Sequence, residues 1–413
     1  MKIKLPFQNM SSNNWQNLGL AALCLFYLLQ IGFDLFWKNT CGHLAIDYCA
    51  FWSAGQIANT RGYAAVYDLQ LMGEIQKTIF PNLGAITPTP FLPIFIVPFQ
   101  PFALLNVSIS FWTWTALNIA VLFLYLRLLS RRITGKAISV RFAALIFLSL
   151  PVFINFFTGQ VNVWLVICIG EFMRATLTDK PFQAGLWLGG LLLKPQILFL
   201  IVLILIAQRS IRILAGFATS STALVWVSIF LAGVSGLQKL AGLWLGYAGG
   251  LPTNDVAIMM NWRMIGLHLG GIAFPMTGWI VVGLGLTTTL YATIYLWRKP
   301  LDFSSSNFVV ALVGLLAATG LFAWHSHIHM AMILIPPLIY LSAQKKMPDQ
   351  ILNYWVFIPA GVYAAVFVTA SFVQVNILPS AINGLLNFLR GASGFGMNIF
   401  LLLWAMKKSA AND

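Results

Sequence analysis

Apolar stretches follow one another along this chain from Leu18 to Met406, and no polar interval between them is long enough for a soluble domain. Because about 20 apolar residues cross a bilayer as one helix, the pattern predicts one all-α domain over residues 1–413, a polytopic integral membrane bundle of about ten spans. Several stretches are short, which indicates tilted or broken helices. The expected spans are 18–37, 110–130, 142–158, 163–178, 213–232, 276–297, 307–324, 330–344, 351–374 and 394–406.

Two intervals between spans are long, 38–106 and 233–275. The first contains a segment from Ala50 to Gly73 that we expect to form an amphipathic or interfacial helix. A proline-rich run follows, and so many prolines exclude an ordinary spanning helix. We expect residues 88–105 to form a juxtamembrane or re-entrant element.

Composition and charge fix the solvent and the orientation. The chain is 59% hydrophobic and 8% charged, which leaves too little polar surface for a water-soluble globule. The net charge of +14 does not indicate nucleic acid, because the Lys and Arg residues cluster at the ends of apolar runs, as the positive-inside rule requires. We expect both termini in the cytoplasm, the first span retained as an anchor, and both long intervals on the extracytoplasmic face.

This orientation changes the interpretation of residues 183–208. One crossing there would place Arg209 and Arg212 on the wrong side. Two half-helices that meet near Lys194-Pro195 and return to the same face remove the conflict, and such broken backbone requires a protein-lined or wet cavity. We expect a re-entrant hairpin; one long helix with a proline kink and a charge exception is the alternative.

The ionisable residues are few, and Asp47 is the most unusual of the acids. It starts an aromatic, weakly polar segment just outside the first span and has no cationic neighbour in sequence. A carboxylate there can act as a general base, or it can simply cap the helix that follows.

Histidines and two cations supply the remaining candidate chemistry. His325, His327 and His329 alternate between two spans; they could bind a metal, form a polar turn, or hydrogen-bond a phosphate or sugar. Hydrogen bonding is favoured, because no acid lies nearby to support a metal. Lys194 and Arg263 suit an anionic phosphate, although Arg263 could equally be a surface charge.

The four cysteines lack the paired spacing of a metal site. Cys41 and Cys49 share the first outer interval, and a disulfide between them is one possibility in an oxidising compartment.

Four motifs, in order, resemble the bacterial glycosyltransferase-C superfamily, and most closely glycosyltransferase family 87. They are Asp47-Tyr48-Cys49-Ala50-Phe51-Trp52-Ser53-Ala54-Gly55, the run Thr89-Pro90-Phe91-Leu92-Pro93 to Pro98, Gly159-Gln160-Val161-Asn162 followed by Ala184-Gly185 and Lys194-Pro195-Gln196, and the histidines before Ile335-Pro336. The chain departs from the family at His329-Met330, where a His-Asp pair is common.

The resemblance implies inverting transfer of a sugar, such as the hexose mannose, from a polyprenyl-phosphate donor to a glycan or glycolipid acceptor. The site would face outward from a bacterial plasma membrane, with Asp47 as the catalytic base and neither metal nor cofactor. Lys194 and Arg263 would offset the charge on the leaving phosphate. The other substrate-binding candidates are Tyr48, Trp52, Gln160, Asn162, Gln196, His327 and His329.

Two other classes compete with this hypothesis. A secondary transporter or flippase of a lipid-linked or anionic solute also uses broken helices and midplane cations, but it usually shows internal repeats, and none is visible here. A membrane acyltransferase would need a His-Asp or buried His-Asn signature, which His329-Met330 does not supply.

Overall fold

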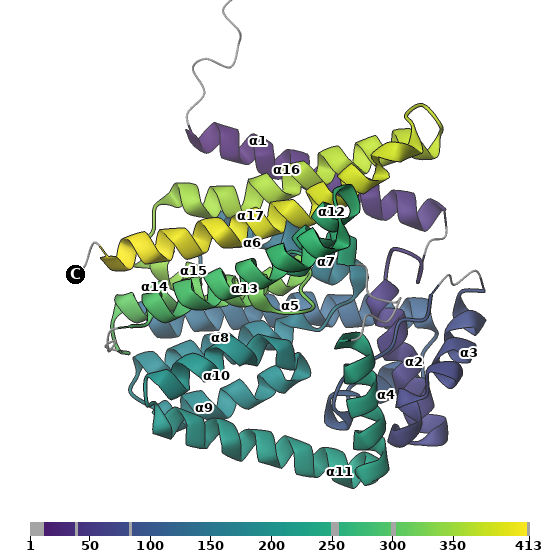
Figure 1. The fold of residues 1–413 in the computed structure, drawn as a ribbon, viewed down its shortest axis with the longest axis horizontal. Coiled ribbons are helices and arrows are strands. Elements are labelled where there is room, and N and C mark those ends of the chain that lie inside the picture. The colour runs from purple at the N-terminus through teal and green to yellow at the C-terminus, as the bar shows by residue number, and fades with distance from the viewer. Residues whose placement is uncertain (1–11, 38–39, 82–84, 249–255, 299–302, 411–413) are drawn as a thin grey trace, which may run out of the picture.

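The computed structural model describes residues 12–37, 40–81, 85–248, 256–298 and 303–410. All regular elements in these ranges are helices, and no strand occurs among them. This confirms the predicted all-α membrane bundle (Figure 1). Six helices are long and apolar enough to cross a membrane. They are α1 (Ser12–Phe36), α5 (Val107–Thr134), α11 (Ile211–Ala248), α13 (Pro275–Leu296), α16 (Asp349–Gln374) and α17 (Asn383–Ala410).

A seventh crossing forms if α6 (Val140–Phe147) and α7 (Leu150–Thr158), bent by 58° at their junction, are taken together. Shorter helices fill the interior. The central one is α14 (Ser306–Phe322), which is buried along nearly its whole length. The number of ten spans stays a prediction, because it counts α14 and other helices that are short for a crossing. Those others are α8 (Asn162–Leu177) and η6 (Ile328–Leu334) joined to α15 (Ile335–Ala343).

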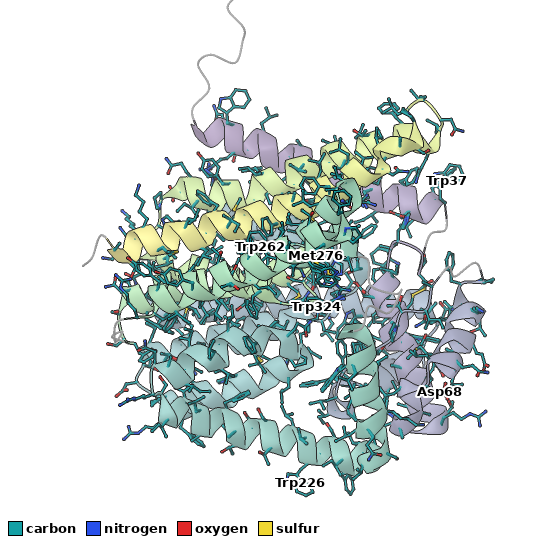
Figure 2. The ribbon with its side chains drawn as sticks, in the orientation of Figure 1. Trp37, Asp68, Trp226, Trp262, Met276 and Trp324 are labelled. Atoms are coloured by element: carbon teal, nitrogen blue, oxygen red, sulfur yellow. A yellow bond between two sulfur atoms is a disulfide. The ribbon has the colours of Figure 1, made fainter. Side chains whose placement is uncertain are left out.

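The outward surface of the bundle is apolar, as a lipid-facing surface must be. Trp226 and Phe230 on α11 are 65% and 89% exposed, and Figure 2 shows Trp226 pointing away from the protein. Helix ends are closed locally: Asn106 accepts a hydrogen bond from the Ser108 amide at the start of α5, and Gly135 ends that helix in the left-handed conformation.

The interruption predicted around Lys194 is present: the helix breaks at this residue while the backbone continues. Helix α9 (Pro181–Gly189) continues into η3 (Gly190–Leu193), and after Lys194 η4 (Pro195–Ile197) leads into α10 (Leu198–Ala207). Helix α9 packs against α8 and α11, whereas α10 packs against α11 and α14 (Figure 1). Whether this unit re-enters a bilayer from one face stays a prediction.

A second layer covers one end of the bundle. It contains α2 (Ile46–Arg61), η1 (Tyr63–Tyr67), α3 (Leu69–Ile79), η2 (Pro93–Phe95) and α4 (Phe99–Phe102). The expected interfacial helix over Ala50–Gly73 is thus three elements. Helix α2 is largely buried because the rest of the layer, α5 and α7 pack against it. Helix α3, with Asp68 as its cap, keeps an exposed polar face.

Part of the predicted outer interval 233–275 is also helical. Helix α11 breaks at Gly233, with φ of 68°, and continues to Ala248 against the second layer. Leu240 and Leu243 join its small apolar core, and the Trp244 indole donates to the Pro90 carbonyl at 2.9 Å. The remaining elements near this end are η5 (Val256–Ile258), α12 (Trp262–Ile272) and η7 (Ser380–Ile382).

Helix α17 begins at Asn383, earlier than the span predicted from residue 394. The two long predicted outer intervals, 38–106 and 233–275, pack on each other at one end of the bundle, because the second half of α11 contacts η1 and η2. Helix α1 begins and α17 ends at the opposite end, on the left of Figure 1.

Candidate functional site

A cavity of about 840 Å³ lies where the second layer meets the bundle. Its walls come from the end of α1, the start of α2, the proline-rich run, the end of α7, the break at Lys194, the histidine segment, and α16 and α17. The polar groups that line it are Gln30, Asp34, His43, Asp47, Thr87, Thr158, Gln160, Lys194, Gln196, His325, His327, His329, Tyr363, Ser371, Gln374 and Arg390.

Asp47 is placed by a tight junction between α2 and α7. The Ala45 amide donates to the Phe157 carbonyl at 2.8 Å. The next contact is between Tyr48 and Gly159, where a side chain on the glycine would place its Cβ 2.4 Å from the Tyr48 Cβ. Gly159 also has φ of 76°, which favours glycine. Asp47 stands in the first turn of α2 and does not cap it, since the cap position is Ala45.

The Asp47 carboxylate has three polar neighbours. The side chains of Gln160 and Thr158 and the charge of Lys194 all favour its ionised form. Burial raises the pKa of Asp47 above its usual range, against the opposing effect of these three groups. The carboxylate is therefore a stronger base than an exposed one while remaining open to the cavity.

Lys194 is the centre of this wall. Its ammonium donates to Gln160 Oε1 at 2.9 Å, and both residues are less than a tenth exposed. Gln196, two residues on, donates to the His325 carbonyl at 3.5 Å. The helix break thus places the Lys194 cation and the Gln196 amide in the same cavity as Asp47, which comes from a distant part of the sequence.

The three histidines form a row beside Lys194. Ring centroids are 4.8 Å apart for His325 and His327, and 5.7 Å apart for His327 and His329. Burial, with the neighbouring charge of Lys194, lowers the pKa of His327 to about 4. Burial lowers the pKa of His325 as well. Neutral imidazoles can donate or accept hydrogen bonds, but they contribute no cationic charge near neutral pH.

Six of the predicted site residues line this cavity, namely Asp47, Gln160, Lys194, Gln196, His327 and His329. The other four do not. Tyr48 is fully buried, with its hydroxyl on Ser110, and the Trp52 indole donates to the Leu105 carbonyl at 3.1 Å.

Asn162 is also buried behind the cavity wall, where its amide donates to Asn155 Oδ1 at 3.0 Å. The Arg263 guanidinium lies over the Trp324 ring at 4.7 Å, and Trp324, not Arg263, faces the cavity. These four side chains are placed to support the wall.

A second polar wall escaped the sequence analysis. The Gln30 amide donates to the Tyr363 hydroxyl at 2.6 Å, and the Arg390 guanidinium lies 5.9 Å from the Tyr363 ring. Nearby, His43 pairs with buried Asp34 at 3.4 Å. The Arg390 Nε is buried and has no hydrogen-bond partner. The signal in the sequence was Arg390, a lone arginine next to an apolar run. Because the last span was predicted to start at residue 394, Arg390 was expected in a loop and not in the helix.

Cys41 and Cys49 form a disulfide, with Cα atoms 5.7 Å apart. It ties the segment before α2 to the first turn of that helix, on either side of Asp47. Within the described residues, no three His, Cys, Asp or Glu side chains form a group that could hold a metal ion.

Comparison with known proteins shows one relationship. The model of glycosyltransferase family 87 matches residues 92–319, more than half of the chain. The match includes Gln160, Lys194 and Gln196 and ends before the histidine row; Asp47 precedes it. No curated protein and no solved structure shows detectable similarity to the chain. On the family match, with its bundle of apolar helices, the chain belongs to glycosyltransferase family 87 and is a membrane glycosyltransferase.

Proposed function

We propose that the protein transfers a sugar from a polyprenyl-phosphate donor to a hydroxyl of a glycan or glycolipid acceptor, with inversion at the anomeric carbon. The donor sugar is a hexose such as mannose. The observation that carries the proposal is the position of Asp47, whose carboxylate faces a large cavity beside Gln160 and Lys194.

In the proposed step, the acceptor oxygen forms a bond to the anomeric carbon as the bond from that carbon to the phosphate oxygen breaks. Asp47 takes the hydroxyl proton as general base. The electron pair of the broken bond stays on the polyprenyl phosphate, which leaves with an additional negative charge. Cations already in place lower the free energy of that charged state.

Inversion requires the base and the phosphate on opposite faces of the sugar. Lys194 is linked through Gln160 to Asp47 and therefore belongs to the side of the base. Arg390 reaches the cavity from α17, and its charge is not among those that act on Asp47. We therefore assign binding of the donor phosphate to Arg390. We assign to Lys194 the role of holding Gln160 in place and favouring the ionised form of Asp47. Arg263 is dropped as a direct phosphate ligand because it lies behind Trp324.

The proposal places the cavity on the extracytoplasmic face. Arg131 and Arg132 end α5, and Lys407 and Lys408 end α17. The C-terminal end of α17, which carries the latter pair, lies away from the second layer (Figure 1). Basic residues accumulate on the cytoplasmic side, and a disulfide next to Asp47 suits an oxidising compartment.

The test is transfer by the purified protein in lipid. A polyprenyl-phosphate hexose with a labelled sugar is offered with a glycolipid extract, and the anomeric configuration of the product is determined by NMR. Asp47→Asn keeps the shape of the side chain and should reduce kcat about 100- to 10,000-fold. Undiminished transfer by Asp47→Asn would show that Asp47 is not the general base. A product that retains the donor configuration would refute inversion.

A further inference from the structure

Helix α1 buries polar side chains and exposes apolar ones. Its buried stripe consists of Leu23, Tyr27, Gln30 and Asp34, each less than a tenth exposed. These positions are three or four residues apart and therefore share one face of the helix. Leucines that are 60% exposed or more occupy the opposite face, namely Leu25, Leu28 and Leu29. Polar side chains turned toward the interior of a membrane bundle are candidates for function.

Two of the buried side chains, Gln30 and Asp34, line the cavity around Asp47. Gln30 Oε1 and Asp34 Oδ1 are both buried and have no hydrogen-bond partner among the described residues. The Gln30 nitrogen is used by Tyr363, to which it donates at 2.6 Å. His43 Nδ1 lies 3.4 Å from Asp34 Oδ1 without hydrogen-bonding it. Because a buried acceptor without a donor is unfavourable, these two oxygens suit a ligand that brings donors into the cavity.

The charges on this wall indicate the class of ligand. The Asp34 carboxylate repels an anion and accepts a hydrogen bond from a neutral donor. The Arg390 guanidinium lies 5.9 Å from the centre of the Tyr363 ring, and the Tyr363 hydroxyl accepts from Gln30. The wall therefore combines one cation, assigned above to the donor phosphate, with acceptors for neutral hydroxyls. A sugar attached to a phosphate carries both groups.

We propose that Asp34 and Gln30 bind hydroxyls of the donor hexose, an inference that rests on the proposed transfer from a polyprenyl-phosphate sugar. One hydroxyl donates to Asp34 Oδ1 and another to Gln30 Oε1, while Arg390 holds the phosphate. Asp34 takes no proton in the reaction, which leaves the role of base to Asp47. The wall selects the donor sugar by the positions of its hydroxyls, because an analogue that lacks one of them leaves a buried acceptor unpaired.

The experiment measures donor binding in the absence of acceptor, with the purified full chain in lipid nanodiscs. Radiolabelled polyprenyl-phosphate mannose is competed with analogues that each lack one hydroxyl of the sugar. The wild type should bind one analogue about 100-fold more weakly than the complete donor, through the charged acceptor Asp34, and a second about tenfold more weakly, through Gln30. Asp34→Ala should reduce the first difference to about threefold or less, and Gln30→Leu the second, because the matching acceptor is gone.

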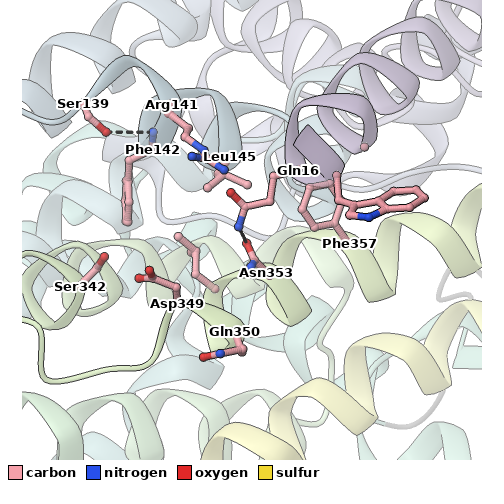
Figure 3. Close-up of a pocket in the computed structure, with 13 residues that line it drawn as sticks. Gln16, Ser139, Arg141, Phe142, Leu145, Ser342, Asp349, Gln350, Asn353 and Phe357 are labelled. Atoms are coloured by element: carbon pink, nitrogen blue, oxygen red, sulfur yellow. Dashed lines mark hydrogen bonds between the residues drawn. The ribbon is translucent and has the colours of Figure 1, made fainter. Parts of the chain in front are cut away.

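Two substitutions on the same helix are matched controls. Tyr27→Phe removes another buried oxygen without a partner in the described chain, but Tyr27 does not line the cavity. Gln16→Leu removes the other glutamine that joins α1 to α16. Gln16 donates to Asn353 Oδ1 at 2.8 Å in a separate cavity, which shares no residue with the one around Asp47 (Figure 3). Both controls should discriminate among the analogues as the wild type does.

Each variant is first compared with the wild type by thermal unfolding, and Gln30→Leu carries the test if Asp34→Ala does not fold. Equal binding of all analogues by the wild type would overturn the inference. Discrimination that survives unchanged in Asp34→Ala and Gln30→Leu, or that Gln16→Leu loses as well, would also overturn it. These outcomes leave donor binding intact, whereas a wild type that does not bind the complete donor would refute the proposed function itself.

Discussion

At the scale of single residues, the proposed general base Asp47 would act only when ionised, so its raised pKa should determine how transfer depends on pH. Below the pKa of Asp47 the carboxylate is protonated and cannot accept the hydroxyl proton, so kcat/KM should fall as the pH falls through that value. Because burial raises the pKa, this acid limb should start at a higher pH than for an exposed aspartate.

Thr158 offers a direct check of that pH dependence. Its side chain favours the ionised form of Asp47 and so lowers the pKa of that carboxyl. In Thr158→Val, a substitution of nearly the same shape, the acid limb should move upward by about one pH unit. Thr158→Ser keeps the hydroxyl and should leave the limb in place. An unchanged limb in the valine variant would mean that another group sets the profile.

Substitutions of the two cations of the cavity, Arg390 and Lys194, should change different kinetic constants. If Arg390 binds the donor phosphate, Arg390→Gln should raise KM for the donor about tenfold or more, and Arg390→Lys should restore part of the loss. Lys194→Gln should act mainly on kcat, since Lys194 holds Gln160 and Asp47. Arg263→Gln, outside the cavity lining, is the control. A KM effect in Lys194→Gln with none in Arg390→Gln would reverse the assignment.

At the scale of elements, the disulfide fixes the start of α2. A cross-link that closes a loop of this size, with cysteines eight residues apart, contributes about 2–3 kcal/mol by the chain-entropy estimate. The double variant Cys41→Ser and Cys49→Ser should lower Tm and weaken transfer, whereas Cys24→Ser, at a free cysteine, should change neither. Reductant should reproduce the loss in the wild type only.

The contact between α9 and α11 depends on glycines. A Cβ at Gly185 would stand 2.0 Å from the Ile213 carbonyl oxygen, and backbone cannot move aside cheaply. Gly185→Ala should therefore destabilise the protein by about 1–3 kcal/mol, measured by thermal unfolding in detergent. Gly283→Ala on α13, where no atom lies within 4 Å of the added carbon, should be neutral or slightly stabilising. Equal effects would contradict the close packing.

At the scale of the whole molecule, the proposed orientation puts α3 and the C-terminal end of α17 on opposite sides of the membrane. In a background with Cys24 and Cys168 replaced by serine, a membrane-impermeant maleimide should label Asp68→Cys in intact cells. It should label Lys408→Cys only after permeabilisation. The reverse pattern would invert the bundle and place the Asp47 cavity in the cytoplasm.

Hydrophobic patterning predicted the all-α membrane fold, because apolar runs as long as that of α1 are stable only when lipid surrounds them. The break at Lys194 was also predictable, from a proline beside a cation inside an apolar stretch. The second layer was not, because α2 is buried by contacts with α4, η1 and α5 that no local pattern encodes. Arg390 was missed for a similar reason: its place in the cavity depends on where α17 begins.

The break at Gly233 gives the cavity one wall that comes from the second half of α11. Trp244 lines the cavity from beyond that glycine and is fixed to the Pro90 carbonyl. A residue with a side chain would be strained at the φ of 68° found there. Insertions or substitutions at this hinge would resize the chamber without altering Asp47 or Arg390, so related enzymes could diverge in the bulk of the molecule they accept while sharing one chemistry.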